Sequence, residues 1–422
     1  FGLFKDGMLG GYCLEPRPKG VVLCIATWNF PCKNTLQSIA GAVAAGNYVT
    51  CVVPSYKSTP NTSKEILRMC KSHLKSFQKY IQFVSGGREN IETLLKMKWN
   101  HIFLVGSPAM GRIVHQATVR HLTTCTLELG GKCPCIVLDN LSADKGLEDH
   151  AISRVIGGKF YNTGQVCIGV DYLLVHKSYG DRFVKKLLSA IRKKYGKHGA
   201  VDSKHLGKIV NKKHFDRLCS IMDTDNEFLT YGGENSTTTL RIAPTIYNFK
   251  TDVTSFLGSM CMSREIFGPL LPIVYFDSIA EALEIVNANP DPLAAYMFAS
   301  KGASHTIKDT FNQLRAGSIT LNDTCLQNKS TAFPFGGVES SGIGRFYGRY
   351  TFDQFSYEVP IVIRHLATKN RFAKMSFLLN PIHRFLLWLG NGTTVGLNYK
   401  WIIYIMCSVL IVILSLILTR VS

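Results

Sequence analysis

Short apolar runs alternate with helix-length runs along most of the chain, and this rhythm constrains the fold more than any other feature. We expect strands at 20–27, 48–53, 101–106, 271–276, 294–300 and 317–322, and helices at 32–46, 279–289 and 304–314. Strands that alternate with helices over short connections form parallel sheets covered by helices. The sequence therefore predicts an open α/β architecture.

The length and composition indicate a globular protein with more than one domain. A chain of 422 residues exceeds one ordinary hydrophobic core, and 46% hydrophobic with 18% charged residues is not the composition of a disordered chain. The 13 cysteines form neither a metal-ligand ladder nor a CxxC pair, so we expect no metal site and reduced thiols facing the cytosol. The chain begins with Phe1, within what reads as a folded pattern, which suggests a fragment.

The net charge of +19 does not by itself indicate nucleic-acid binding, because of where the charges lie. Many of the lysines and arginines fall within 181–217, which reads as a helix with a solvated basic face. No alternation of basic and aromatic residues and no zinc-finger spacing accompanies it. We therefore expect no nucleic-acid partner. After Glu358 every charged residue is basic, which points to a membrane.

The uncharged apolar run 401–419 is bracketed by Lys400 and Arg420. A helix of that length is about 28 Å long, close to the hydrocarbon thickness of a bilayer. A buried core helix is the alternative, but such a helix usually has polar positions on one face. We expect a single-pass C-terminal anchor, a basic juxtamembrane linker at 361–400, and a catalytic part in the cytosol. The short span favours the endoplasmic reticulum over the mitochondrial outer membrane.

One cysteine differs from the rest in its sequence context: Cys167, in "FYNTGQVCIG". It lies near Gly164, Gln165 and Gly169, where the backbone can turn sharply and present a side chain to a cleft. A small buried hydrophobe is the ordinary alternative for a cysteine. The choice between the two depends on polar residues elsewhere in the chain.

Two connections place polar residues suited to acyl chemistry. "ATWNFP" at 26–31 follows a strand and holds Asn29, which is either a neutral donor for a developing oxyanion or a helix cap. "LELGGKCP" at 127–134 places Glu128 in an apolar strand before two glycines. Desolvation there would raise the pKa of this carboxyl toward that of a general base, and a structural salt bridge is the alternative.

A third connection, "FLVGSPAMG" at 103–111, reads as a strand, a glycine turn and the start of a helix. Gly106 and Gly111 allow close approach of the backbone, and with Ser107 they precede or open a helix whose amides can bind a phosphate. The pattern is weak as a motif, because it is not the full G-x-G-x-x-G.

Taken in their order along the chain, Asn29, the turn at 106–111, Glu128 and Cys167 resemble the motifs of the aldehyde dehydrogenase superfamily. "REIFGPLLPI" at 264–273 is similar to its E-E-I-F-G-P stretch, and "PFGGVESSGIGRFYGRYTFDQFSYE" at 334–358 to the glycine-rich closing segment of its class 3, fatty-aldehyde-type branch. The resemblance runs from about residue 15 to 358. Fatty aldehyde dehydrogenases also carry a C-terminal membrane anchor, and in that family a helical segment usually precedes the equivalent of "EPRPKGVV".

The resemblance implies a domain order. It places an N-terminally truncated Rossmann-type nucleotide-binding domain at 1–128 and an α/β catalytic thiol domain at 129–322. A glycine-rich segment at 323–360 then returns to the nucleotide and oligomerisation side, before the linker and the transmembrane helix. A homodimer is implied for the full-length protein.

The resemblance also implies a reaction: NAD(P)-dependent oxidation of long-chain aldehydes to carboxylic acids at a membrane surface. Cys167 would attack the aldehyde as a thiolate, activated by a modest fall in its pKa. The Asn29 amide and the backbone N–H of Cys167 would hold the oxyanion. Glu128 would activate the water that hydrolyses the thioester.

For the cofactor, NAD with NADP as the second option, the resemblance assigns a further set of residues. Glu265 would hold the nicotinamide ribose and Phe267 would pack beside the ring. The other expected cofactor-binding residues are Gly106, Ser107, Gly111, Leu129 and Gly130.

The cofactor side departs from the family at several positions. Val105 stands where a threonine often precedes the phosphate turn, and Gln327 where class 3 members often have histidine after "NDT". "VVPSY" stands where the family typically has L-K-P-S-E, so Val53 and Tyr56 replace the lysine and glutamate that hold the adenosine ribose. Lys57 is a candidate substitute. A catalytically impaired, membrane-anchored scaffold with lost nucleotide affinity is therefore the alternative to a working enzyme. Nucleotide-independent ester hydrolysis by the same thiol is a third hypothesis.

Overall fold

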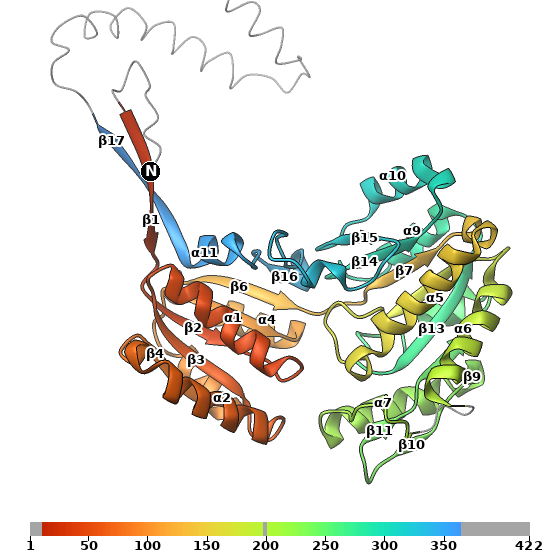
Figure 1. Cartoon of the computed structure of the whole chain (residues 1–422), viewed down its shortest axis with the longest axis horizontal. Helices are drawn as coiled ribbons and strands as arrows, with labels where there is room; N and C mark the ends of the chain where they lie inside the picture. The colour runs from red at the N-terminus through yellow and green to blue at the C-terminus, as the bar shows by residue number, and fades with distance from the viewer. Residues whose placement is uncertain (1–10, 197–200, 364–422) are drawn as a thin grey trace, which may run out of the picture. The chain divides into compact units, whose positions relative to one another are not determined.

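The computed structural model describes residues 11–196 and 201–363 (Figure 1). Residues Pro16–Val359 form one compact unit that carries both large sheets. The expected membrane segment 401–419 and all but the first residues of the linker 361–400 lie outside the described residues. Within the described part of the chain, no helix is both long and apolar enough to cross a membrane.

The first sheet has six strands in the order β16-β6-β5-β2-β3-β4, and only the short β16 is antiparallel to its neighbour. Its strands are β2 (Val21–Ile25), β3 (Tyr48–Ser55), β4 (Ile81–Gly86), β5 (His101–Gly106), β6 (Thr124–Leu129) and β16 (Gly342–Ile343). The helices between them are α1 (Pro31–Ala44), α2 (Pro60–His73), α3 (Arg88–Leu95) and α4 (Pro108–Val119). The central strands are largely apolar and buried, as expected for a parallel sheet covered by helices.

The order of strands reverses between β2 and β5. The chain runs outward from β2 through β3 and β4, and β5 then pairs with the opposite edge of β2. In open α/β sheets the crevice at the carboxyl ends of the strands, at such a reversal, is where ligands bind. The topology therefore predicts where a site should lie.

The second sheet has seven strands in the order β15-β14-β7-β8-β13-β12-β9, parallel except for β9 (Figure 1). Its strands are β7 (Pro134–Val137), β8 (Tyr172–His176), β9 (Leu229–Tyr231), β12 (Thr245–Asn248), β13 (Leu270–Phe276), β14 (Ala295–Phe298) and β15 (Ile319–Leu321). Its helices are α5 (Lys145–Phe160), α6 (Gly180–Tyr195), α7 (Lys212–Thr224), α8 (Val253–Gly258), α9 (Ile279–Asn287) and α10 (Ser304–Gln313).

After the second sheet the chain returns to the first. β16 pairs with β6, so that Gly342 lies opposite Glu128. A Cβ at Gly342 would stand 2.3 Å from the Leu127 carbonyl oxygen, and its φ is 151°, so only glycine fits this close pairing. The remaining elements are α11 (Arg349–Phe355), the pair β10 (Asn235–Ser236) and β11 (Arg241–Ile242), and the pair β1 (Gly11–Pro18) and β17 (Ser356–Ile363).

The α/β architecture expected from the alternating runs is confirmed, and the differences are confined to the ends of elements. The strand expected at 20–27 is Val21–Ile25, because Gly20 has a φ of 125° and cannot extend the strand. The helix expected at 32–46 begins at Pro31, which is favoured in a first turn, and ends before Gly46, whose φ is 87°.

Candidate active site

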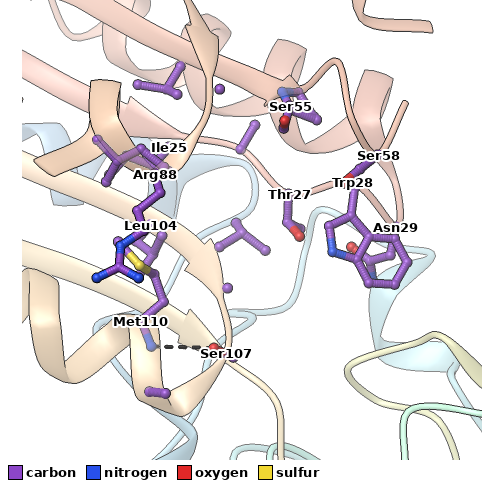
Figure 2. Close-up of a pocket in the computed structure, with 18 of the residues that line it drawn as sticks. Ile25, Thr27, Trp28, Asn29, Ser55, Ser58, Arg88, Leu104, Ser107 and Met110 are labelled. Atoms are coloured by element: carbon purple, nitrogen blue, oxygen red, sulfur yellow. Dashed lines mark hydrogen bonds between the residues drawn. The ribbon is translucent and has the colours of Figure 1, made fainter. Parts of the chain in front are cut away.

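A cavity of about 1030 Å³ opens at the carboxyl ends of β2, β3 and β5, where the strand order reverses. Figure 2 shows part of its wall, with Thr27, Trp28 and Asn29 following β2, and Ser107 and Met110 at the start of α4. Residues of α7 and of the segments that precede β8 and β13 complete the wall. The cavity therefore lies where the topology predicts a binding site.

Cys167 lies on this wall because of an unusual turn. Asn162, Thr163 and Gly164 have consecutive φ values of 48°, 56° and 76°, all in the left-handed region. A Cβ at Gly164 would lie 2.2 Å from the Gly268 carbonyl oxygen, so the turn packs directly on the backbone that precedes β13. Two non-glycine residues held in this region mark stored strain, which concentrates at functional sites.

Asn29 is tied to the same turn. Its Nδ2 donates to the Gln165 carbonyl oxygen at 3.2 Å, and Asn162 Nδ2 donates to the Asn29 carbonyl oxygen at 3.1 Å. The second N–H of the Asn29 amide therefore remains free to donate into the cavity that both Asn29 and Cys167 line.

Glu128 lies at the end of β6 with 2% of its surface exposed. Neither carboxyl oxygen has a geometrically satisfactory hydrogen bond to another described residue. Burial raises the pKa of Glu128 to about 7, against smaller lowering effects of the Cys167 side chain and Lys33. The salt-bridge alternative is therefore not what the structure shows, since a carboxyl with this pKa exchanges its proton near neutrality.

The expectation of a lowered pKa for Cys167 is wrong. Burial raises the pKa of this thiol well above its ordinary value, and the neighbouring Glu128 carboxylate raises it further. A thiolate beside a carboxylate in a desolvated site is unfavourable. Activation therefore requires transfer of the thiol proton to a base, and Glu128 is placed to accept it.

The turn after β5 carries the start of α4. Ser107 is the N-cap of this helix, and its Oγ accepts from the Met110 backbone N–H at 3.3 Å (Figure 2). Gly106 and Ser107 line the cavity. The helix N-terminus thereby presents unsatisfied amide groups of the kind that bind phosphate.

Gly111 and Leu129, both expected to contact the cofactor, do not line the cavity. Gly111 is inside α4, and a Cβ there would lie 2.6 Å from a Leu129 methyl group. The glycine lets α4 approach β6 closely, and the contact of Gly111 and Leu129 with the cofactor stays a prediction.

Glu265, Phe267 and Gly130 all line the cavity. A Cβ at Gly130 would stand 2.3 Å from the Glu265 carboxyl oxygens, so glycine makes room for that carboxyl. Burial raises the pKa of Glu265 to about 8, and Asp171 adds to this. Phe267, with a left-handed φ of 48°, meets the Trp28 ring edge-on at a centroid distance of 5.5 Å.

A buried ion pair fixes the segment that carries Glu265. Lys132 Nζ bonds Asp171 Oδ2 at 2.5 Å and the Arg264 carbonyl oxygen at 3.3 Å. Asp171 Oδ1 accepts from the Ile266 backbone N–H at 3.0 Å. Because Asp171 follows Cys167 by one short segment, the thiol turn and the Glu265 segment are positioned by one network.

The cavity also takes residues that the sequence analysis missed. Arg217 donates from Nη2 to the Ile266 carbonyl oxygen at 2.5 Å, and its Nη1 is buried without a partner among the described residues. Arg264 and Arg88 line the same cavity, together with Lys57, which the sequence analysis named as a candidate. These cations and the α4 N-terminus fit the diphosphate of a dinucleotide. Arg217 is the last residue of the stretch 181–217, which the sequence analysis interpreted as a solvated basic face. Nothing in the local sequence distinguishes it from the other basic residues of that stretch.

Val53 and Tyr56, which depart from the family pattern, lie on the cavity wall at the carboxyl end of β3. Val53 is fully buried and packs with Ile66 and Cys70, while Tyr56 is exposed. Both line the cavity, as does Lys57. This part of the wall therefore offers an apolar side chain and a phenol where the family has a lysine and a carboxylate.

A second, smaller cavity of about 20 Å³ meets Cys167 and Glu128 from the other side. It is lined mainly by aromatic and aliphatic side chains: Phe30, Val105, Val166, Ile168, Phe335, Phe346 and Tyr347. Its polar side chains, besides the thiol and the carboxyl, are Lys33, Asn34 and Asn328. Cys167 and Glu128 thus line both cavities.

Comparisons with known proteins agree with this geometry. Residues 12–359 match the model of the "Aldehyde dehydrogenase family". The chain is 36% identical over 360 residues to aldehyde dehydrogenase family 3 member A2 of Pongo abelii, covering 85% of this chain and 70% of that one. It is also 36% identical over 354 residues to the dimeric NADP-preferring aldehyde dehydrogenase of Canis lupus familiaris, covering 84% and 74%.

A solved structure shows the same likeness. The substrate-bound state of Staphylococcus aureus AldH superimposes with a TM-score of 0.75 at 33% sequence identity, covering 85% of this chain and 75% of that chain. The likeness therefore extends over most of this chain.

Proposed function

The chain belongs to the aldehyde dehydrogenase family and is an aldehyde dehydrogenase oxidoreductase, and from that premise we propose that it oxidises long-chain aldehydes to carboxylic acids at a membrane surface through Cys167. The observation that carries the proposal is the convergence of Cys167, Glu128 and Asn29 on one cavity. A nucleophile, a base and an oxyanion donor are the parts that acyl chemistry at a thiol needs.

The first step is addition of the thiol to the aldehyde. Glu128 accepts the Cys167 proton, the sulfur forms a bond to the carbonyl carbon, and the carbonyl oxygen becomes an oxyanion. A carboxyl with a pKa of about 7 is suited to this transfer because it is substantially ionised at neutral pH. The oxyanion receives hydrogen bonds from the Asn29 amide and the Cys167 backbone N–H, and one such donor is typically worth about 3–4 kcal/mol.

The family uses NAD(P), which when bound supplies the acceptor for the hydride that leaves the carbon attached to Cys167. We propose that Ser107 and the α4 N-terminus hold its diphosphate with Arg217, while Glu265 and Phe267 hold the nicotinamide end. Glu265 is suited to a ribose hydroxyl because a pKa of about 8 leaves a proton that the carboxyl can donate. Gly130 leaves the space that this carboxyl occupies.

Hydrolysis of the thioester completes the cycle. Glu128 first releases to solvent the proton that it took from Cys167, which is the net proton of the oxidation. It then takes a proton from water, the hydroxide adds to the acyl carbon, and the carbon–sulfur bond breaks to release the acid. The sulfur leaves as the thiolate and regains a proton from Glu128, which restores both groups. The same carboxyl thus serves the thiol and the water in turn, and its lack of fixed hydrogen bonds leaves it free for both.

The proposed substrate class and the proposed membrane attachment are supported by different features of the chain. The aromatic and aliphatic side chains around Cys167 and Glu128 support an apolar group next to the thiol, and the run 401–419 supports membrane attachment. We propose cytosolic orientation, preferentially at the endoplasmic reticulum, and a homodimer as in the relative named dimeric. Co-flotation with phospholipid vesicles, lost when 401–419 is deleted, tests the attachment.

A second candidate, a scaffold with impaired nucleotide binding, is favoured by Val53 and Tyr56 on the cavity wall. Calorimetry with NAD and with NADP, beside an assay of aldehyde oxidation and ester hydrolysis, separates the hypotheses. The proposed enzyme binds a nucleotide and oxidises a long-chain aldehyde. Absence of nucleotide binding with retained ester hydrolysis would instead favour a cofactor-independent hydrolase, and absence of all three activities a scaffold.

A further inference from the structure

The smaller cavity holds a cation that the proposed mechanism has not used. Lys33 lines it together with Cys167 and Glu128, and among the described residues of that lining it is the one cation. Glu128 is buried, and both of its oxygens lack a satisfactory hydrogen bond. A buried carboxylate without hydrogen bonds needs a nearby opposite charge to remain ionised.

Three separate segments hold the Lys33 ammonium. The side chain leaves the first turn of α1, directly after the loop that carries Asn29. Its Nζ donates to the Asn328 carbonyl oxygen at 3.3 Å and lies 4.9 Å from the centroid of the Tyr347 ring. A carbonyl oxygen and an aromatic face both attract a cation, so the position of the ammonium is set by contacts on both sides.

Local helix energetics do not explain this lysine. The first turn of a helix favours acidic side chains and disfavours cations, and the first turn of α1 has no acidic residue to offset Lys33. A residue that contradicts the local preference is expected where a function compensates for it. Lys33 is an exposed residue whose ammonium group is partly buried. This burial lowers the pKa of Lys33, and Cys167 and Glu128 act in the opposite direction.

We propose that Lys33 is a positioning residue whose ammonium group keeps Glu128 ionised, so that the carboxylate is available to take the Cys167 proton. This inference rests on the proposed function and deepens it. The proton passes from the Cys167 sulfur to a Glu128 oxygen, so the negative charge moves from one group to the other while the facing cation stabilises it in both places. The other titratable groups that act on Cys167 or Glu128 are Glu265, Cys133 and Tyr347.

The test is the pH dependence of Cys167 alkylation by iodoacetamide, followed by mass spectrometry of the peptide that contains Cys167. This readout needs neither nucleotide nor turnover. Lys33→Met removes the charge and keeps much of the apolar stem. We expect the midpoint of the alkylation profile to rise by about one unit, the lower end of what loss of a neighbouring opposite charge produces, and the rate at pH 6.5 to fall about tenfold.

Two controls isolate the charge. Lys33→Arg retains a cation and should restore the parent profile, and Lys64→Met makes the same chemical change on α2, outside both cavities, and should not move it. The thermal midpoint of Lys33→Met should not fall, because removal of a cation from a helix N-terminus does not weaken the helix. Lys33→Gln serves as a second neutral variant where Lys33→Met does not fold.

The outcomes are distinguishable. An unchanged profile in both neutral variants, or a Lys33→Arg profile that moves as far as theirs, contradicts the role of the charge while leaving Cys167 as the nucleophile. A parent protein whose Cys167 is not alkylated at any pH at which the chain stays folded contradicts the proposed function, and this inference with it.

Discussion

The two ends of the large cavity are built on different principles. At the Cys167 end, the polar groups that would react are buried and poorly satisfied: both Glu128 oxygens and Asn29 Oδ1 lack partners among the described residues. At the Val53 end, the wall is a well-packed aliphatic side chain beside the exposed Tyr56. The first arrangement costs stability and serves chemistry, whereas the second is ordinary packing.

The difference teaches that chemistry and nucleotide affinity are separable in this molecule. The thiol, the base and the oxyanion donor depend on the turn at 162–164, the end of β6 and the loop after β2. The adenosine end depends on the carboxyl ends of β3 and β4, which share no residue with that centre. Changes at one end should therefore leave the other measurable, and the predictions below test that separation.

The largest effect is expected at the nucleophile. Cys167→Ser replaces a thiol by a much less acidic hydroxyl and should lower aldehyde oxidation by at least about a thousandfold. Nucleotide binding by calorimetry and the thermal midpoint should remain those of the parent, because the adenosine end is untouched. Turnover above a few per cent would show that another group carries the acyl chemistry.

The oxyanion donor comes next. Asn29→Ala removes the amide and should lower kcat about 10²–10³-fold, the usual cost of one such donor. Asn29→Asp is the matched variant of nearly equal volume, and its like charge beside Glu128 should be at least as damaging. A fall confined to KM, with kcat preserved, would indicate that Asn29 binds the substrate and not the developing charge.

The cost of the buried carboxyl predicts a pH dependence of stability. The pKa of Glu128 is about 7 in the folded chain against an ordinary 4.5, so the folded state binds more protons between these values. The free energy of unfolding should therefore fall as pH rises from about 4.5 to 7. Glu128→Gln removes this contribution and should be more stable than the parent at pH 8 by about 1–3 kcal/mol in urea denaturation.

Burial also raises the pKa of Glu265. Because Glu265 is present in both the parent and the Glu128→Gln variant, it contributes a dependence of unfolding free energy on pH that the two share. A parent and variant with equal stability at pH 5 and at pH 8 would mean that Glu128 carries no buried charge.

The smallest effect is expected at the Val53 end. Val53→Lys with Tyr56→Glu should tighten NAD about tenfold, since one regained charge-assisted bond is worth roughly 1.5 kcal/mol. The lysine stem can remain among Ile66 and Cys70 while the ammonium extends into the cavity. The gain for NADP should be smaller, because a carboxylate repels the 2′-phosphate.

Tyr56→Gln is the matched neutral control for this change. No gain for NAD in the double variant would mean that Lys57 or Arg88, both on the same wall, already fills the role.

The sequence predicted the α/β fold and the residues of the chemical centre better than their electrostatics. Asn29, Glu128 and Cys167 are each recognisable from the strand or turn that carries them, and the structure brings them to one cavity. The pKa of Cys167 was predicted in the wrong direction, because it depends on burial and on the Glu128 charge, which only the folded chain brings together.

The residues missed by the sequence analysis are cations placed by tertiary structure. Arg217 faces the cavity only because α7 packs beside the Glu265 segment, and Lys33 only because Tyr347 and Asn328 return to α1 from the far end of the chain. Gly111 and Leu129, which a family pattern marked for the cofactor, pack on each other, and their contact with the cofactor stays a prediction. The domain boundaries stay predictions.

The most direct test of the central claim, that Cys167 is acylated and Glu128 promotes release of the acid, is to trap the thioester. The test is made at alkaline pH, where solvent hydroxide can take the Cys167 proton in place of Glu128. Glu128→Gln slows hydrolysis and also removes a charge that raises the Cys167 pKa, so the first turnover should still occur there. Mixing this variant with a long-chain aldehyde and nucleotide should give a burst of reduced nucleotide, followed by a slow steady state. Mass spectrometry should then find the acyl group on the peptide containing Cys167, and the Glu128→Gln, Cys167→Ser double variant should show neither burst nor adduct. A slow first turnover without a burst, or an acyl group on a different cysteine, would contradict the account.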